Sequence, residues 1–344
     1  MKKVKRSVKI IIAIALVIVL LLSSGVIFYL SKLNLIKFSN GKFTWSGSPD
    51  MSDSETLDEE SRMNEAIADL EEKDAVDATG EIYKDKRFLN ILLIGTDERA
   101  ESFSENARGD SCMIMSIGKK DGSLKLASLE RGMGVPILDG KYKGQYDWLT
   151  HTFRYGGADL MMREVRECFK VDVERYIRVN FTTFKKGIDS VGGIDINLTA
   201  AEAAYVNGET NRKIYIAGTN HLDSDAALAY ARCRHIDSDW HRIERQRNVI
   251  QAVVTKTKDL SVTELNALLN NVLPLVQTNL TRLEITELLL SAPKYRGVQI
   301  KQMTVPISGS YGGMRGLGGR SLFSVDFDTN AKALREFIYG VTTE

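Results

Sequence analysis

Three apolar segments early in the chain predict three neighbouring strands. Residues 88–97 read FLNILLIGTD, a buried strand that ends at a glycine turn. Residues 111–118, SCMIMSIG, and residues 123–130, SLKLASLE, flank the sequence KKDG, in which Asp121-Gly122 favours a hairpin turn. These strands begin the predicted folded domain.

Helical and strand patterns alternate through the rest of this domain. A helical pattern in HTFRYGGADLMMREVRECF precedes a strand, RYIRVNF, which is followed by a helix, TTFKKGIDSV, and another strand, IDINL. Further helices are expected in AALAYARCR, in HRIERQRNVIQAVVTKTKDL and within residues 261–291, before a last strand, GVQIKQMTV. Interleaved strands and helices predict an α/β domain over residues 82–304, with a central mixed sheet and helices on both faces.

The segment after this domain, residues 305–344, is expected to form a glycine-rich loop and a C-terminal helix. Its stretch SGSYGGMRGLGGR, residues 308–320, contains six glycines, so we expect a mobile loop there. The glycine runs lack the strand-then-helix context of a phosphate-binding loop.

The N-terminus combines a basic tail with a long uncharged run, which predicts one transmembrane helix ahead of the domain. Residues 1–9, MKKVKRSVK, carry five positive charges and no acid, and the 21 residues 10–30 carry no charge. That length suffices to cross a hydrocarbon core of about 30 Å. A cleaved signal peptide is the alternative, but the run is long for one and no clean A-x-A site follows it. We expect an uncleaved signal-anchor in the cell membrane, with a cytoplasmic tail and an extracellular domain.

An acidic segment separates this run from the domain. Residues 50–81 contain thirteen acids and two bases, a net charge of −11. Met63, Ile67 and Leu70 fall at helical spacing, which allows one weak amphipathic helix. We therefore predict that residues 31–81 form an extracellular acidic linker, mostly a solvated spacer that holds a mildly basic domain away from an anionic surface.

Several classes of site are disfavoured because their motifs are missing from this sequence. Its three cysteines show no C-x-x-C spacing and its four histidines no zinc spacing. The cysteines are expected to be small buried residues, with one disulfide left open. The serines and histidines have no nucleophile-elbow motif around them, and the cytoplasmic tail is too short to be a nucleic-acid-binding domain.

Acidic and basic side chains stand at the ends of the apolar strands. Asp97 and Arg99 follow the first strand, Arg108 and Asp110 precede the second, and Arg131 ends the third. If the strands are neighbours, these side chains share one rim of the sheet, where α/β proteins bind ligands. A divalent cation such as Mg²⁺ relieves the repulsion of two carboxylates, and arginines neutralise pyrophosphate oxygens. The alternative is that each side chain merely caps a strand in water.

Arginine is the only long basic side chain in residues 230–247, YARCRHIDSDWHRIERQR. This stretch holds five arginines and no lysine, although the chain has 24 lysines and 22 arginines. A guanidinium grips phosphate or carboxylate through two parallel hydrogen bonds, which lysine does not. Arg242 and Gln246 are four apart and share a helix face, and Arg232 and Arg234 point alike if a helix ends there. A solvated, salt-bridged helix face is the alternative.

Six segments resemble, in order, the LytR-CpsA-Psr (LCP) family of cell-wall glycopolymer ligases. Individually each is moderately specific, and together they are strongly specific. The segments are NILLIGTDER (90–99), ARGDSCMIMSIG (107–118), KLASLERG (125–132), LTHTFRYGGADL (149–160), VNFTTFKKGIDSVGGIDINL (179–198) and LDSDAALAYARCRHIDSDWHRIERQ (222–246).

The resemblance implies a phosphotransferase that moves a glycopolymer from a polyprenyl-pyrophosphate carrier to peptidoglycan during cell wall assembly. It implies Mg²⁺ as cofactor and the carrier-linked glycopolymer, peptidoglycan and the membrane as partners. The catalytic positions it assigns are Asp97, Asp110, Arg131 and Arg242, of which Asp97 and Asp110 bind the metal. The pyrophosphate-binding positions are Arg99, Arg108, Arg131, Arg232, Arg234 and Gln246.

The chain departs from the family pattern close to Arg131. The family's usual S-[IL]-P-R-D reads SLERG here, which places Glu130 before Arg131 and Gly132 after it, and Trp148 replaces a lysine. These changes bear on the support of Arg131 and remove a positive charge that would face the ligand. Two alternatives to the transferase therefore stay open: a polyprenyl-pyrophosphate hydrolase, and a non-catalytic protein that binds the lipid carrier.

Overall fold

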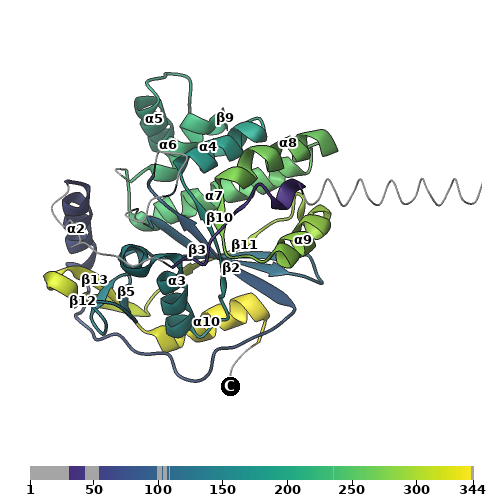
Figure 1. Ribbon diagram of the computed structural model, residues 1–344. Helices are drawn as coiled ribbons and strands as arrows, with labels where there is room; N and C mark the ends of the chain where they lie inside the picture. The colour runs from purple at the N-terminus through teal and green to yellow at the C-terminus, as the bar shows by residue number, and fades with distance from the viewer. Residues whose placement is uncertain are drawn as a thin grey trace, which may run out of the picture.

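The centre of the molecule is a seven-stranded mixed sheet (Figure 1). The computed structural model describes residues 31–42, 54–98, 103, 107, 109–234 and 236–341. The strands of the sheet are Lys37–Phe38 (β1), Phe88–Gly95 (β2), Ser111–Gly118 (β3), Leu124–Leu129 (β4), Arg175–Val179 (β7), Gln277–Thr278 (β10) and Lys301–Val305 (β11). Their order is β1-β10-β7-β2-β3-β4-β11. β3 pairs antiparallel with β2 and β4, while β7 runs parallel to β2 and β11 parallel to β4.

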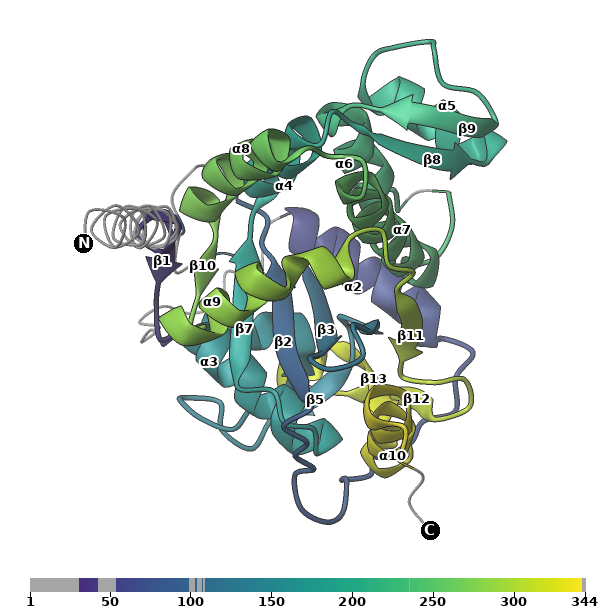
Figure 2. The same cartoon turned by 90° about the vertical axis from the view of Figure 1, so that its right-hand side faces the viewer.

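Helices cover both faces of this sheet, as the sequence predicts. Those on one face are Leu149–Phe169 (α3) and Phe327–Tyr339 (α10); those on the other are Asp239–Thr257 (α7) and Arg282–Ser291 (α9). Successive side chains of a strand point to opposite faces. Leu92 and Ile94 of β2 accordingly join the core under α3 and α10, whereas Ile91 packs with α9. Figure 2 shows α9 in front of the sheet and α3 behind it.

A helical lobe stands beyond the carboxyl ends of β2 and β7. It consists of Phe181–Ser190 (α4), Ala200–Glu209 (α5), Ser224–Arg232 (α6) and Val262–Val272 (α8), with the antiparallel strands Ile194–Leu198 (β8) and Gly218–Leu222 (β9). The lobe has its own apolar cluster, which includes Ile194, Leu222 and Tyr230. The edge of the sheet that faces the lobe is where the polar strand ends of the sequence are found.

Two stretches of the predicted acidic linker belong to the folded domain. Leu33 and Ile36 are buried in the core beside α9, and β1 follows them at the edge of the sheet. Residues Ser54–Ile67 form α2, the amphipathic helix that the spacing of Met63 and Ile67 allows. Both side chains are buried in a cluster with Trp148. In Figure 1, α2 lies at the left beside the C-terminal hairpin.

The glycine-rich stretch forms that hairpin, so the prediction of a mobile loop is wrong. Tyr311–Arg315 (β12) pairs antiparallel with Ser321–Val325 (β13). A Cβ at Gly312 would lie 2.6 Å from the carbonyl oxygen of Glu71, so a glycine here permits close packing of two backbones. The other short elements are Gly134–Pro136 (β5), Tyr146–Trp148 (β6) and three turns of 3-10 helix at Leu273–Leu275, Ala292–Tyr295 and Leu317–Gly319.

The predicted signal-anchor, residues 10–30, lies outside the described residues, as does the basic tail. Of the helices that the structure describes, none combines the length and the apolar character needed to cross a membrane. The cysteines Cys112, Cys168 and Cys233 are buried, as predicted, and none forms a disulfide.

Candidate active site

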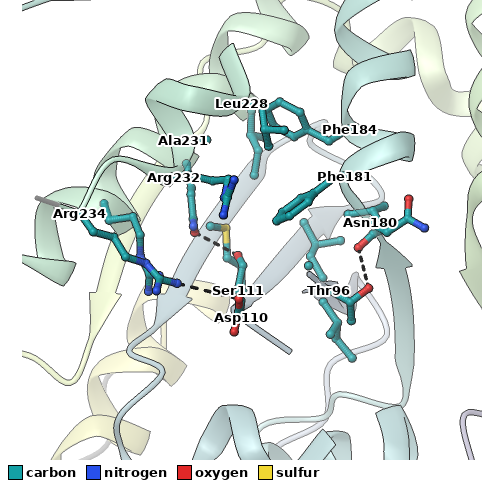
Figure 3. A pocket seen from close by; sticks show the side chains of 18 of the residues that line it. Thr96, Asp110, Ser111, Asn180, Phe181, Phe184, Leu228, Ala231, Arg232 and Arg234 are labelled. Atoms are coloured by element: carbon teal, nitrogen blue, oxygen red, sulfur yellow. Dashed lines mark hydrogen bonds and ion pairs between the residues drawn. The ribbon is translucent and has the colours of Figure 1, made fainter. Parts of the chain in front are cut away.

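A cavity of about 450 Å³ lies between the rim of the sheet and the helical lobe (Figure 3). Figure 3 shows Asp110 and Arg234 on one side of this space, with Phe181 and Phe184 across from them. Its apolar lining consists of Leu93, Ile94, Met113, Ile177, Val179, Phe181, Phe184, Leu228, Ala231 and Ile250. Its polar lining includes Asp58, Arg62, Thr96, Asp110, Ser111, Asn180, Tyr205, Glu209, Arg232, Arg234, Arg242 and Gln246. The cavity thus joins an apolar chamber to a polar part that contains four arginines and three carboxylates.

Strand register brings the two predicted acids to the same edge of the sheet. β2 and β3 are antiparallel, and Gly95 is paired with Ser111. Asp110 therefore precedes the first paired residue of β3, and Asp97 stands two residues beyond the last of β2. Asp110 lines the cavity. Asp97 is half-buried but is not among the lining residues.

The ends of α6 and α7 place the basic side chains. α6 ends at Arg232, whose guanidinium carbon lies 4.8 Å from the ring centroid of Phe181. The helix ends after Arg232, and Arg234 follows it in a segment outside the helix, 3.9 Å from Asp110 at the rim. Arg242 and Gln246 share one face of α7, as their spacing predicts, and both line the cavity. The hydroxyl of Ser111 donates to Oε1 of Gln246 at 3.0 Å, which ties α7 to the start of β3.

Arg131 and Arg234 belong to an ionic cluster beside the cavity. Nε of Arg131 donates to Asp239 at 2.8 Å, and its Nη1 donates to Oε1 of Glu59 at 2.5 Å. Arg234 donates to the same Glu59 oxygen at 3.0 Å and lies 3.9 Å from Oδ2 of Asp110. Arg131 does not line the main cavity; it lines an adjoining hollow together with Glu59 and Asp239. The cluster holds two guanidiniums within reach of one anionic oxygen.

Arg242 is the most deeply buried arginine of this group, with 2% of its surface exposed. Its Nε lies 3.5 Å from Asp239 but makes no hydrogen bond to any described residue. Burial lowers the pKa of Arg242 to about 10, and the nearby positive charges of Arg234 and Arg131 act in the same direction. A buried guanidinium with an unmet donor is an energetically unfavourable arrangement that an incoming anion relieves.

Glu130 is a fully buried carboxyl beneath these arginines. Loss of hydration raises its pKa to about 7, and the negative charge of Asp239 adds to this effect. Oε1 accepts a hydrogen bond from the backbone of Gly132 at 3.3 Å, whereas Oε2 has no hydrogen-bond partner among the described residues. Asp239 behaves in the opposite way: burial alone would raise its pKa, but Arg242 and Arg131 hold that pKa well below its usual range.

The other two arginines of the lysine-free stretch are structural. Arg245 donates to Glu202 at 2.8 Å and also pairs with Asp237, which fastens α7 to α5. Arg247 donates to Gln302 at 3.0 Å and so contacts β11. Both side chains are buried, so the alternative of a solvated helix face does not hold for them, and of the two only Arg245 forms ion pairs with described residues. Neither lines the cavity.

Two predicted pyrophosphate ligands, Arg99 and Arg108, lie outside the described residues. The segment that leads to Arg99 is held by a residue that the sequence analysis did not select. Arg178, 3% exposed on β7, donates to both carboxylate oxygens of Glu98 at 2.9 Å. The strand pattern indicates the burial of Arg178. Arg178 and Tyr176 are two residues apart on the same face of a strand, and Tyr176 is buried.

The departures from the family pattern surround α2. Trp148 is 1% exposed, and its indole donates to the carbonyl of Ser321 at 2.8 Å, so the side chain fills core space rather than facing a ligand. A Cβ at Gly132 would lie 2.0 Å from Cε of Met63, which the glycine therefore accommodates. Arg131 keeps firm support from Asp239 and Glu59 despite both changes.

Comparisons with known proteins agree with this architecture. The LytR_cpsA_psr family matches residues 52–335. The polyisoprenyl-teichoic acid–peptidoglycan teichoic acid transferase TagU of Bacillus mycoides is 34% identical over 197 residues, which cover 56% of this chain and 61% of TagU. The corresponding transferase TagT of Bacillus subtilis is 31% identical over 180 residues, 51% of this chain and 55% of TagT. A solved structure of TagT bound to LIIa-WTA superposes with a TM-score of 0.58 at 25% identity, covering 78% of this chain and 97% of that one. The chain thus spans less than two thirds of the length of the transferases it matches in sequence.

Proposed function

This chain belongs to the LytR-CpsA-Psr family, and from that premise we propose that it transfers a glycopolymer from a polyprenyl-pyrophosphate carrier to peptidoglycan. The main support for this proposal is the cavity. One part is apolar, as a polyprenyl chain requires, and the other presents Arg232, Arg234 and Arg242, as a pyrophosphate requires. A second supporting observation is the buried Nε of Arg242, which lacks a hydrogen-bond acceptor among the described residues.

In the proposed reaction, a hydroxyl oxygen of peptidoglycan attacks the phosphorus that carries the glycopolymer. A new P–O bond forms to the acceptor, and the bond from that phosphorus to the bridging oxygen breaks. The bridging oxygen leaves with its electron pair as part of polyprenyl phosphate. The hydroxyl proton passes to a carboxylate, for which we propose Asp110 among the carboxylates that line the cavity. Arg234 and Arg242 stabilise the negative charge that develops on the leaving phosphate.

Mg²⁺ is part of this proposal, with Asp97 and Asp110 as its protein ligands. Among the described residues, no group of three or more His, Cys, Asp or Glu side chains is arranged to hold a metal. Mg²⁺ is commonly held by one or two carboxylates together with substrate phosphates and water, and two acids at one sheet edge fit that pattern. The bound ion would neutralise pyrophosphate charge.

The proposed site of action is the outer face of the cell membrane. The support comes from the sequence of residues 1–30, a basic tail followed by 21 uncharged residues, which predicts a transmembrane helix with a cytoplasmic N-terminus. The polyprenyl chain of the carrier also lies in that membrane, so carrier and cavity would meet at its surface.

The proposal is tested with the full chain in detergent micelles, a polyprenyl-pyrophosphate-linked sugar, Mg²⁺ and peptidoglycan oligomers. Release of polyprenyl phosphate and sugar transfer are measured in parallel for the parent, Asp110→Asn, Arg242→Gln and the surface control Arg282→Gln. We expect transfer by the parent and the control and a loss of about 100-fold or more in the two site variants. Carrier cleaved without an acceptor would show a hydrolase instead, and carrier bound but never consumed would show a binding protein.

A further inference from the structure

The carboxylate of Glu59 occupies an unusual place for a residue from an acidic, mostly exposed segment. It is 2% exposed. Its Oε1 accepts hydrogen bonds from Arg131 at 2.5 Å and from Arg234 at 3.0 Å. One oxygen that receives two guanidinium donors reproduces the surroundings of a non-bridging phosphate oxygen.

Helix α2 carries this carboxylate into the site. Met63 and Ile67 fix the helix against the cluster around Trp148. Asp58 and Arg62, which form an ion pair at 2.9 Å, line the main cavity from the same helix. α2 is therefore a wall of the cavity as well as the element that inserts Glu59.

α2 is attached through a few buried side chains and several polar contacts. Over residues 57–67 only Glu59, Met63 and Ile67 are buried, and Leu57 is 54% exposed. Glu60 pairs with Arg320 at 2.9 Å, and Oδ1 of Asn64 accepts hydrogen bonds from Arg315 and Ser321. When Glu59 leaves, Arg131 still has Asp239 as a partner. Release of the Glu59 carboxylate therefore does not leave Arg131 as an unpaired buried charge.

Resting on the proposed function, we propose that Glu59 fills a phosphate position of the carrier site and that the pyrophosphate must displace it to bind. The same two guanidiniums cannot give the same donors to both anions. α2 then carries a competitor on the same chain. Because a ligand must displace Glu59 to bind, this competition favours a ligand with two phosphates over a single weakly charged anion. Gly132 serves this arrangement, because it leaves room for Met63 beside Arg131.

The test is calorimetric binding of inorganic pyrophosphate, with Mg²⁺, to the full chain in micelles. Glu59→Gln keeps the shape of the side chain but removes its charge, so we expect an affinity increase of about tenfold, the equivalent of one charge-assisted hydrogen bond. Glu65→Gln removes an exposed charge from the same helix and should leave the affinity within about twofold of the parent.

A second measurement on the parent needs no substitution. Hydrogen exchange of the α2 amides should become faster when pyrophosphate binds, because the helix loses its anchoring carboxylate contact. Equal or weaker binding by Glu59→Gln, or α2 amides that become more protected, would overturn the inference while leaving the transferase proposal intact. A parent and variants that all fail to bind pyrophosphate would overturn both.

Discussion

Replacing Glu130 by glutamine should stabilise the protein at neutral and alkaline pH, but little in acid. Burial moves the pKa of this carboxyl from 4.5 to about 7. Since each pH unit corresponds to about 1.4 kcal/mol, ionising Glu130 inside the folded protein costs about 3 kcal/mol relative to the unfolded chain. The stability that protonated Glu130 confers is fully present below pH 4.5 and is lost as the pH rises to about 7. Glutamine stays neutral throughout.

The assay is thermal denaturation of the full chain in micelles between pH 5 and pH 8, with parent and Glu130→Gln run side by side. The advantage of the variant should grow from about 1 kcal/mol at pH 5 to about 3 kcal/mol at pH 8. The exposed Glu167→Gln serves as a control and should show no such pH-dependent difference. A constant difference across this range, or a variant less stable at pH 8, would mean that Glu130 ionises freely and that its burial carries no penalty.

Four further outcomes are expected. Arg242→Lys should fold, by circular dichroism, yet lose about 100-fold in transfer rate, because an ammonium cannot reproduce the buried planar donors; near-parental activity would contradict this. Trp148→Lys, which restores the family residue, should lower Tm through an unsatisfied core charge at a cost of about 3 kcal/mol or more without raising transfer. Asn180→Ala removes the side-chain cap of α4 and should cost about 1 kcal/mol, with a higher KM because Phe181 shifts; an unchanged melting curve would disprove the cap's contribution. Chelation by EDTA should abolish transfer, and added Mg²⁺ should restore it.

The sequence predicts the elements that carry a local periodic signal. β2, β3 and β4 fall where continuous apolar runs and the Asp-Gly turn place them, and the four-residue spacing of Arg242 and Gln246 brings both to the cavity. These are short-range patterns, in which the spacing of side chains along a helix or strand determines which of them face the same way.

The features that the sequence does not predict depend on contacts between distant parts of the chain. Glu59 looks like one more solvated acid, because nothing near it in the sequence reveals two arginines 72 and 175 positions away. The glycines near residue 312 indicate flexibility by composition alone, yet Gly312 is needed for the close approach of the backbone at Glu71. Neither the burial of a charge nor a backbone contact across the fold produces a periodic pattern in the sequence.

The early attachment of the chain to the sheet would, with the proposed membrane anchor, limit how far the domain can work from the bilayer. Leu33 and Ile36 are already in the core, and β1 begins at Lys37. Seven residues from position 31 to 37 extend to at most about 25 Å, and they are partly coiled. With the proposed anchor ending at residue 30, this short connection would keep the domain close to the lipid surface. Older, more distant layers of the wall would lie out of its range, so new polymer would be attached only to peptidoglycan strands closest to the membrane.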